Sequence, residues 1–291
     1  LIKVGQASKY RRILTGSPIT KSPMDLFSQC AFLDTDALGF NSFYGFQGRY
    51  AVVQRRNMGS HSFNHIVGYR RLDELGERLD RFSSRVLKED CLDLPEKVYL
   101  RREVSLSKEQ VVLYHQMQEL ALAQLEQGKL ATTASVLTQI MRLQQICCGH
   151  LQPDDGPIQP IKNNRLSELL DVIEEVQGKA IIWATWTHDI HAIEEALAKQ
   201  YGPGAVASYF GETPQEDRQD IIERFQDPES ELRFFVGQPR TGGYGITLTE
   251  ANTVIYFSNS YDLEIRLQSE DRAHRIGQND TVTYVDLVSP G

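Results

Sequence analysis

Apolar residues follow two alternating patterns in the chain from about residue 162 onward. Runs of neighbouring apolar residues, typical of buried strands, occur at 180–184 (AIIWA), 205–210 (AVASYF), 232–237 (LRFFVG), 253–258 (TVIYFS) and 281–288 (TVTYVDLV). Between them, apolar residues recur at helical spacing over 165–177, 189–200, 214–225 and 263–275. Short apolar strands separated by such helices predict an α/β fold with a parallel, doubly wound sheet.

Ligands of such sheets bind beside the carboxyl ends of the strands. Three segments follow those ends: TWTHD after 180–184, QPRTGGYGITL after 232–237, and the stretch that leads from 253–258 into the last helix. That helix carries QSEDRAHRIGQ, from Gln268 to Gln278. Arg272 and Arg275 lie three positions apart and would share a helix face, so the pattern predicts that both guanidinium groups bind one anion. A carboxylate such as Glu270 or Asp271, a nucleotide phosphate and a nucleic-acid backbone are the candidates.

The region 93–161 indicates a linker followed by a helical protrusion. Pro95 breaks any helix, and the alternation of Val98, Leu100 and Val104 predicts a strand. Ser107, with a glutamine at the capping-box position three residues later, predicts a long helix that ends at Gly128. A second helix is expected over 132–147, and the Pro- and Gly-rich stretch 152–160 indicates a hinge.

The first 92 residues contain two further patterns. Arg11 to Ile19 (RRILTGSPI) resembles a short strand, and Leu72, Leu75 and Leu79 stand at helical spacing. Five arginines in and beside that helix supply much of the positive charge of this zone: Arg70, Arg71, Arg78, Arg81 and Arg85. They face either a nucleic acid or water.

Charge and cysteine content narrow the class of protein. The chain has 291 residues and a net charge of −8, but basic residues outnumber acidic ones in residues 1–92 and acidic ones dominate afterwards. This asymmetry indicates local contact with a polyanion or, equally, a solvated charged surface. The sequence shows neither an apolar run of roughly 20 residues nor a signal-peptide pattern, so we expect an intracellular protein without a membrane span. The four cysteines are sparse and irregularly spaced, which indicates free thiols.

Two motifs of nucleotide hydrolysis are missing from the sequence. It has no GxxxxGK[ST] phosphate loop and no acidic magnesium motif, and TGGYG, from Thr241 to Gly245, lacks the lysine and the following Ser or Thr. The chain is therefore not expected to hold ATP and Mg²⁺ by itself.

Four motifs together resemble the Swi/Snf-type ATPases of helicase superfamily 2, whose motor consists of two RecA-like lobes. ILTGSPI (13–19) is similar to motif III, GKAIIWATW (178–186) to motif IV, RTGGYGITLTEANTVIYF (240–257) to motif V and QSEDRAHRIGQ to motif VI. DRAHRIGQ is the most specific to this family. RLQQICCGHL (142–151) resembles the family's helical segment before lobe 2, which replaces a zinc interpretation of Cys147, Cys148 and His150.

The sequence departs from the family pattern at two places. Thr20 or Lys21 stands where the family has Asn after motif III, and Pro239 stands where motif V has Ser or Thr before its arginine.

The resemblance implies a role for each motif residue. Arg272 and Arg275 would be arginine fingers that reach ATP on lobe 1, Arg275 toward the γ-phosphate, and Gln268 would help to position them. Gly243 and Gly245 would let the backbone approach the nucleotide. Thr15 and Gly16 would couple nucleotide state to DNA. Residues Thr185, Arg240, Thr241 and Gly242 would contact the nucleic-acid backbone. Mg²⁺ would be held by lobe 1, and this chain would supply no metal ligand.

The resemblance also implies a domain plan and a function. Residues 1–92 would be the end of lobe 1 with a first helical protrusion, 93–161 a linker with a second protrusion, and 162–291 the RecA-like C-terminal lobe. The chain would be part of an ATP-dependent translocase on double-stranded DNA, from a phage or bacterium, inactive without the rest of lobe 1. Its location would be cytoplasmic, or nuclear in a eukaryote. Another superfamily 2 motor, acting on RNA or in a restriction system, and a non-enzymatic nucleic-acid-binding scaffold are the alternatives.

Overall fold

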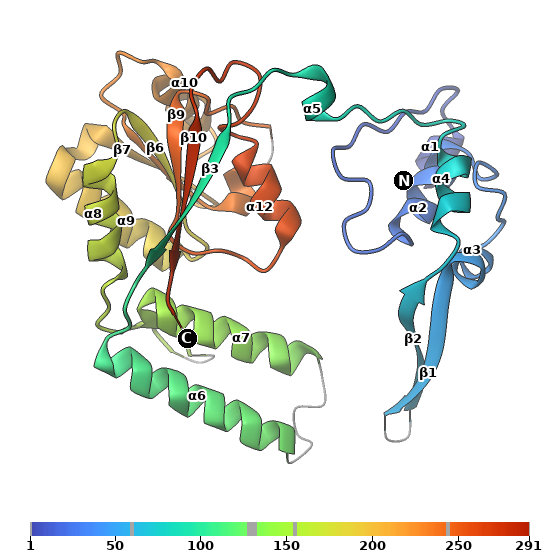
Figure 1. Cartoon of the computed structure of the whole chain (residues 1–291), viewed down its shortest axis with the longest axis horizontal. Helices are drawn as coiled ribbons and strands as arrows, with labels where there is room; N and C mark the ends of the chain where they lie inside the picture. The colour runs from blue at the N-terminus through green and yellow to red at the C-terminus, as the bar shows by residue number, and fades with distance from the viewer. Residues whose placement is uncertain (1, 59–60, 127–132, 154–155, 243–244, 291) are drawn as a thin grey trace. The chain divides into compact units, whose positions relative to one another are not determined.

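A six-stranded parallel sheet forms the centre of residues 92–291 in the computed structural model (Figure 1). Its order is β3-β10-β9-β6-β8-β7, and every neighbouring pair of strands is parallel. The α/β class and the parallel sheet expected from the sequence are confirmed. The structure describes residues 2–58, 61–126, 133–153, 156–242 and 245–290. The chain divides into two compact units, Leu1–Cys91 and Leu92–Gly291.

The strands of the second unit are short and mostly buried. They are β3 (Lys97–Glu103), β4 (His150–Leu151), β5 (Gln159–Pro160), β6 (Lys179–Trp183), β7 (Val206–Tyr209), β8 (Phe234–Gly237), β9 (Ala251–Tyr256) and β10 (Val282–Val288). The helices are α6 (Lys108–Glu126), α7 (Thr133–Cys148), α8 (Arg165–Glu175), α9 (Thr187–Tyr201), α10 (Asp217–Gln226), α11 (Pro239–Gly242) and α12 (Leu263–Glu270), with a 3₁₀ turn at Pro203–Ala205. β4 and β5 pair with each other outside the main sheet. β4 precedes the expected hinge at 152–160, and β5 forms its last two residues.

Helices cover both faces of the sheet, because successive side chains of a strand point to opposite faces. Ile182 of β6 lies in one core with residues of α8 and α9 such as Ile173 and Ile193. Trp183, the next residue, lies in the other core with Phe225 of α10. All of these side chains are fully buried.

Two described helix ends of the second unit differ from the sequence expectation by three residues or more. α10 begins at Asp217, because Thr213 Oγ1 accepts from the N–H of Phe210 at 3.0 Å and holds the preceding segment in a turn. α12 ends at Glu270, so Arg272 and Arg275 are not on a helix and the expected shared helix face is wrong. The Leu248 N–H donates to the Arg272 carbonyl oxygen at 2.9 Å, which draws the chain out of the helical path.

Helices α6 and α7 lie at the carboxyl edge of the sheet (Figure 1). The capping box that begins α6 is confirmed: the Gln110 N–H donates to Ser107 Oγ at 3.2 Å, and the Ser107 N–H donates to Gln110 Oε1 at 2.9 Å. Gln110 also donates to the Ile146 carbonyl oxygen at 2.7 Å and so ties the two helices together. The expected helix end at Gly128 lies outside the described residues. Among the described helices, none is long and apolar enough to cross a membrane.

The first unit combines short helices with one antiparallel hairpin. Its elements are α1 (Ile2–Gln6), α2 (Asp25–Leu33), α3 (Phe43–Tyr50), β1 (Ala51–Met58), β2 (His61–Tyr69), α4 (Leu72–Leu79) and α5 (Lys88–Cys91). Phe46, Tyr50 and Leu75 are buried in its core. The helix expected near Leu72 is confirmed, whereas the hairpin was not foreseen. Residues 11–19 form neither helix nor strand, and Leu14 is 95% exposed, so the expected strand there is wrong.

Candidate functional site

Three loops meet at the carboxyl ends of β6, β8 and β9. The Thr185 N–H, after β6, donates to the Ser258 hydroxyl oxygen beyond β9 at 2.8 Å. The Gln238 amide, after β8, donates to the Thr185 carbonyl oxygen at 3.3 Å. The Thr241 hydroxyl donates to Gln238 Oε1 at 3.4 Å. Two residues expected from the sequence, Thr185 and Thr241, are therefore joined through Gln238. Sequence reasoning missed Gln238, although its place directly after a buried strand was the available signal.

Arg272 and Arg275 lie in the turn that follows α12 and converge on one atom. Nη1 of Arg272 donates to the Ile246 carbonyl oxygen at 3.3 Å, and Nη1 of Arg275 donates to the same oxygen at 3.2 Å. Nε of Arg272 also donates to the Gln268 carbonyl oxygen at 3.0 Å. The turn thus brings the two guanidinium groups together beside Ile246, the residue that follows Gly245.

The electrostatics of this pair favour an anion. Burial, and after it the charge of Arg275, lowers the pKa of Arg272, and the charge of Asp271 offsets part of this effect. An arginine still remains protonated at neutral pH, so the pair presents two positive charges to each other. A phosphate or carboxylate beside them would relieve both the desolvation and the repulsion.

The Gln268 side chain lies in a separate polar hollow. Its amide donates to Glu264 Oε1 at 2.8 Å, whereas Arg272 bonds to the main-chain carbonyl oxygen of Gln268. The hollow has a volume of about 240 Å³ and is lined by Pro239, Arg240, Asp262, Glu264, Ile265 and Gln268. The structure therefore places Arg240 beside Gln268.

The Gly-rich loop is described only in part. Gly242 ends α11, Gly245 has a left-handed φ of 79°, and Gly243 lies outside the described residues. A Cβ built on Gly245 would meet no heavy atom within 4 Å, so the backbone there is open to approach. Pro239, the departure from the family pattern, is the first residue of α11, a position where proline is well tolerated.

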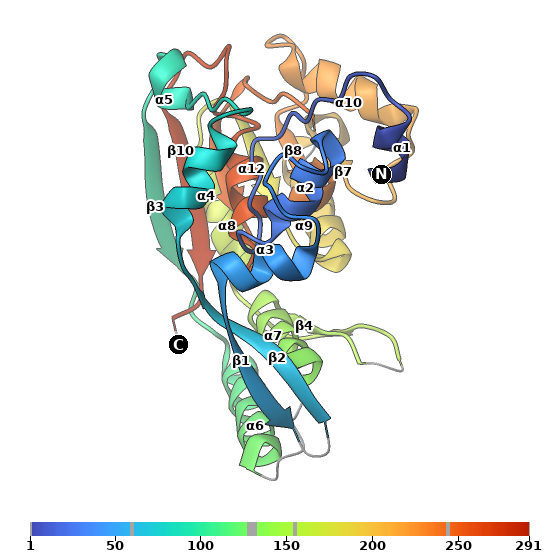
Figure 2. The same ribbon diagram turned by 90° about the vertical axis from the view of Figure 1, so that its right-hand side faces the viewer.

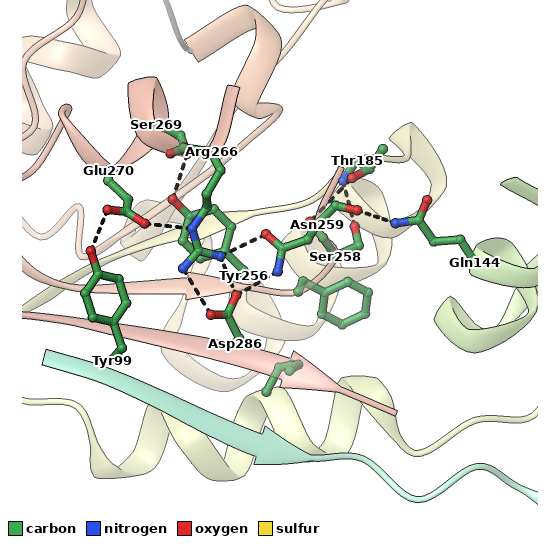
Figure 3. A network of polar contacts seen from close by, with 12 residues as sticks. Tyr99, Gln144, Thr185, Tyr256, Ser258, Asn259, Arg266, Ser269, Glu270 and Asp286 are labelled. Atoms are coloured by element: carbon green, nitrogen blue, oxygen red, sulfur yellow. Dashed lines mark hydrogen bonds and ion pairs between the residues drawn. The ribbon is translucent and has the colours of Figure 1, made fainter. Parts of the chain in front are cut away.

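A buried polar network fixes α12 against the sheet (Figure 3). Arg266 of α12 lies with Cζ 3.5 Å from the ring centroid of Tyr256, on β9. Its guanidinium donates to Glu270 Oε1 at 2.8 Å and to Asn259 Oδ1 at 2.9 Å. It also donates to both carboxylate oxygens of Asp286 on β10, at 3.0 Å to Oδ2. Sequence reasoning missed Arg266; its spacing of four residues from Glu270 on a predicted helix was the signal.

Glu270 extends the network to the edge strand β3. Its Oε2 accepts from Lys97 Nζ at 3.0 Å and from the Tyr99 hydroxyl at 2.8 Å. Burial raises the pKa of this carboxyl, but hydrogen bonds from Arg266 and from the two β3 residues outweigh it, so that the net pKa is lowered. Burial, followed by the hydrogen bond to Glu270, raises the pKa of Tyr99 to about 12. Glu270, one of the acids considered for the arginine pair, is thus bonded to Arg266 and β3.

Two contacts join α7 to the carboxyl edge. The Gln144 amide donates to the Asn259 carbonyl oxygen (Figure 3). His150, directly after α7, places Nδ1 at 3.1 Å from Asp189 Oδ1 at the start of α9, and both side chains are buried. Burial also raises the pKa of the neighbouring Cys148 thiol. Among the residues that the structure describes, no group of three or more His, Cys, Asp and Glu side chains is placed to hold a metal ion.

Thr15 and Gly16 lie in the first unit, on an exposed loop. Thr15 Oγ1 accepts from the Ser17 N–H at 3.1 Å, and a Cβ built on Gly16 would meet nothing within 4 Å. The next turn is held by Asp25, whose Oδ2 accepts from the N–H groups of Thr20 and Lys21 at 3.2 and 2.9 Å. These hydrogen bonds, that from Lys21 above all, lower the pKa of the Asp25 carboxyl. Thr20 and Lys21, which stand where the family has Asn, are therefore hydrogen-bonded through their main chain to Asp25.

Two family models match the chain. Residues 4–151 match the SNF2-related domain, and residues 161–277 match the helicase conserved C-terminal domain. The chain belongs to the SNF2-related family, the Swi/Snf-type ATPases of helicase superfamily 2. The resemblance seen in the motifs is confirmed.

Similar curated proteins come from yeast, bacteria and animals. The chain is 27% identical over 305 residues to the chromatin structure-remodeling complex subunit snf21 of Schizosaccharomyces pombe, covering 97% of this chain and 25% of that protein. It is 26% identical over 288 residues to the putative ATP-dependent helicase/translocase YwqA of Bacillus subtilis, covering 96% of this chain and 30% of that protein. The chain therefore spans about a quarter to a third of the length of these relatives.

Two solved structures share the fold. The Sulfolobus solfataricus SWI2/SNF2 ATPase core in complex with dsDNA aligns with a TM-score of 0.55 at 27% identity, covering 99% of this chain and 60% of that chain. The C-terminal part of the Fun30 ATPase domain aligns with a TM-score of 0.54 at 19% identity, covering 68% of this chain and 86% of that chain.

Proposed function

We propose that this chain is the C-terminal part of an ATP-dependent translocase motor on double-stranded DNA, and that Arg272 and Arg275 act as its arginine fingers. The observation that carries the proposal is their convergence on the Ile246 carbonyl oxygen at 3.3 and 3.2 Å. Two guanidinium groups held this close to each other fit a phosphate group, which can accept hydrogen bonds from both.

ATP and Mg²⁺ fit this chain to different degrees. The arginine pair suits the nucleotide phosphates, whereas the described residues contain no cluster of three metal-binding side chains. We therefore assign the phosphate loop and the Mg²⁺ ligands to the preceding lobe of the same polypeptide. ATP with Mg²⁺ supplies the phosphoryl group that is transferred to water, and the charge on that group is what Arg275 and Arg272 would stabilise.

The chain's own residues would orient this pair. The main-chain carbonyls of Gln268 and Ile246 hold Arg272 from two sides. Arg266 and Glu270 hold the helix from which the turn leaves, and so limit where the two guanidinium groups can move.

DNA would be contacted through its backbone. Similarity over 99% of the chain to a SWI2/SNF2 core solved with dsDNA supports this substrate. We assign the contacts to Thr185, Arg240, Thr241 and Gly242 at the carboxyl edge, with Thr15 and Gly16 in the first unit. Contacts to phosphates alone make binding independent of sequence and sensitive to salt.

The test is duplex-stimulated ATP hydrolysis by the whole protein, wild type beside Arg275→Ala. Loss of a transition-state arginine is expected to lower kcat by about a thousandfold while leaving the Kd for nucleotide within a fewfold. The matched control is Arg224→Ala, because Arg224 forms only an exposed ion pair with Asp220 on α10. If the wild type is inert with every duplex and single strand, the motor assignment fails and a scaffold takes its place; if Arg275→Ala keeps its kcat, the finger assignment fails.

A further inference from the structure

The β1–β2 hairpin of the first unit has exposed residues on both of its faces, at 52–55 and 62–65. The two strands pair from Ala51↔Tyr69 to Met58↔His61 (Figure 2). Residues 52–55 on β1 and 62–65 on β2 are all exposed, so successive side chains, which point to opposite faces, all reach water. Phe63 is 46% exposed and Val53 is 37% exposed.

The base of the hairpin is firmly attached to the core. Ala51 is buried, and Ile66 packs against the cluster that contains Phe46. The Arg70 N–H donates to the Tyr50 carbonyl oxygen at 2.8 Å, and its side chain donates to the carbonyl oxygens of Gly48 and Arg49. The ribbon is therefore held in one direction from its base.

Stability of the fold does not explain this ribbon. A lone two-stranded hairpin is marginally stable in water, and exposed β-branched and aromatic side chains on unpaired edges invite association with other chains. An element that carries these costs is expected to have a binding partner.

The charge of the hairpin identifies the chemistry of that partner. Between Tyr50 and Leu72 the sequence contains four arginines and no acidic residue, in a chain whose net charge is −8. Nε and Nη2 of Arg55 donate to the Ser62 hydroxyl at 3.1 and 2.7 Å. Because serine is neutral, this contact orients the guanidinium without neutralising it. These positive charges without acidic neighbours in the sequence fit a polyanionic partner.

We propose that the β1–β2 hairpin is a nucleic-acid-binding element that enters a groove of the duplex. A two-stranded β-ribbon fits the major groove of B-DNA, and an eight-residue strand is about 27 Å long, enough to cross it. Arg55 pairs with Asn64, so Arg55 and Phe63 lie on opposite faces of the ribbon. Phe63 packs against the base edges, and the long Arg55 side chain contacts a phosphate at the rim of the groove. The proposal rests on the proposed function in taking duplex DNA as the substrate, and it adds a contact outside the helicase motifs.

The experiment measures the affinity of the whole protein for a fluorescent duplex at several KCl concentrations. Arg55→Ala is expected to reduce the slope of log K against log salt by about 0.9, the loss of one phosphate contact. Phe63→Ala is expected to weaken binding by about threefold or more with an unchanged slope, since it carries no charge. Arg101→Ala is the charge-matched control, because Arg101 is an exposed arginine on β3, outside the hairpin and outside the proposed DNA contacts. Thermal melting of each variant shows whether its fold is intact.

The outcomes separate the two proposals. Equal slopes for Arg55→Ala and Arg101→Ala, in a protein that binds duplex and hydrolyses ATP, overturn the hairpin proposal and leave the motor assignment standing. Failure of the wild type to bind duplex overturns both. Two results together support the hairpin proposal and the motor assignment: a reduced salt slope for Arg55→Ala, and a loss of ATP turnover in Arg275→Ala but not in Arg55→Ala.

Discussion

The Arg266 guanidinium lies over the ring of Tyr256, with 3.5 Å between Cζ and the ring centroid. The same group is bonded to the carboxylates of Glu270 and Asp286, and only 16% of its side chain is exposed. A buried cation held by two carboxylates and a ring face leaves little freedom for the helix that carries it. Arg266 is therefore the residue on which the position of α12 most depends.

Replacing this cation is expected to destabilise the second unit. Arg266→Ala leaves the Glu270 and Asp286 carboxylates without their shared partner, which costs about 3 kcal/mol in the free energy of unfolding. Urea unfolding measures this loss of stability, and amide hydrogen exchange in β9 and β10 shows whether it is located at the network. Arg224→Ala, which removes an exposed ion pair, is expected to cost at most about 0.5 kcal/mol; similar losses for both variants would contradict the importance of the network.

The Glu270 carboxylate is expected to make stability depend on acid pH. Its pKa in the folded protein is lowered from the ordinary value of 4.5. Its contribution is then complete above pH 4.5 and is lost as the pH falls through the lowered, folded-state pKa. Glu270→Gln should lose stability at neutral pH, and its deficit relative to wild type should shrink below pH 4.5. Urea unfolding over this range is the measurement, with exposed Glu195→Gln as the control. A deficit that stays constant into acid would refute the assignment.

Lys179 closes the end of α10 from inside the protein. Its Nζ donates to the carbonyl oxygens of Arg224, Phe225 and Asp227, and burial lowers the pKa of the amine. Lys179→Met keeps the stem but leaves these carbonyls without a donor, so we expect a loss of about 2 kcal/mol in unfolding free energy. Chemical denaturation measures it, and exposed Lys199→Met on α9 should be nearly neutral.

The capping box of α6 gives a local test. Ser107→Ala removes the acceptor of the Gln110 N–H and is expected to destabilise the helix by about 1 kcal/mol. Ser107→Thr keeps a hydroxyl and should retain most of that stability. Amide hydrogen exchange in the first turn of α6 distinguishes the two; equal protection in both variants would show that the cap is dispensable.

Local apolar patterns were enough to predict most of the second unit. β6 reads as a continuous apolar run because both of its faces are covered, and this signal needs no knowledge of its neighbours. The strand predicted at Arg11–Ile19 is absent because a few apolar residues do not form a strand without a pairing partner. Leu14 is exposed to solvent instead. The hairpin had a signal that was overlooked: two runs with several β-branched or aromatic residues, at 51–58 and 61–69, flank Gly59 and Ser60.

Contacts between distant segments account for the remaining differences. The sequence singled out Arg272 and Arg275, but Leu248, far away in the chain, decides that they lie in a turn. Tyr99 and Glu270 meet only because β3 lies beside β10, which no local pattern reveals. Gln238 and Arg266 likewise act through contacts with residues distant in the chain. Sequence motifs alone could not assign these roles.

The pairing of β3 with β10 has a consequence for synthesis on the ribosome. β3 is the first strand of the sheet to be made, yet its neighbour in the sheet is the last, with Lys97 opposite Val282. The emerging chain must therefore carry an unpaired strand while five others are translated, and non-local parallel pairing of this kind is slow. Lys97 and Tyr99 reach Glu270 only when β10 arrives, so the support of the turn that carries Arg272 and Arg275 is complete only after β10 has been translated.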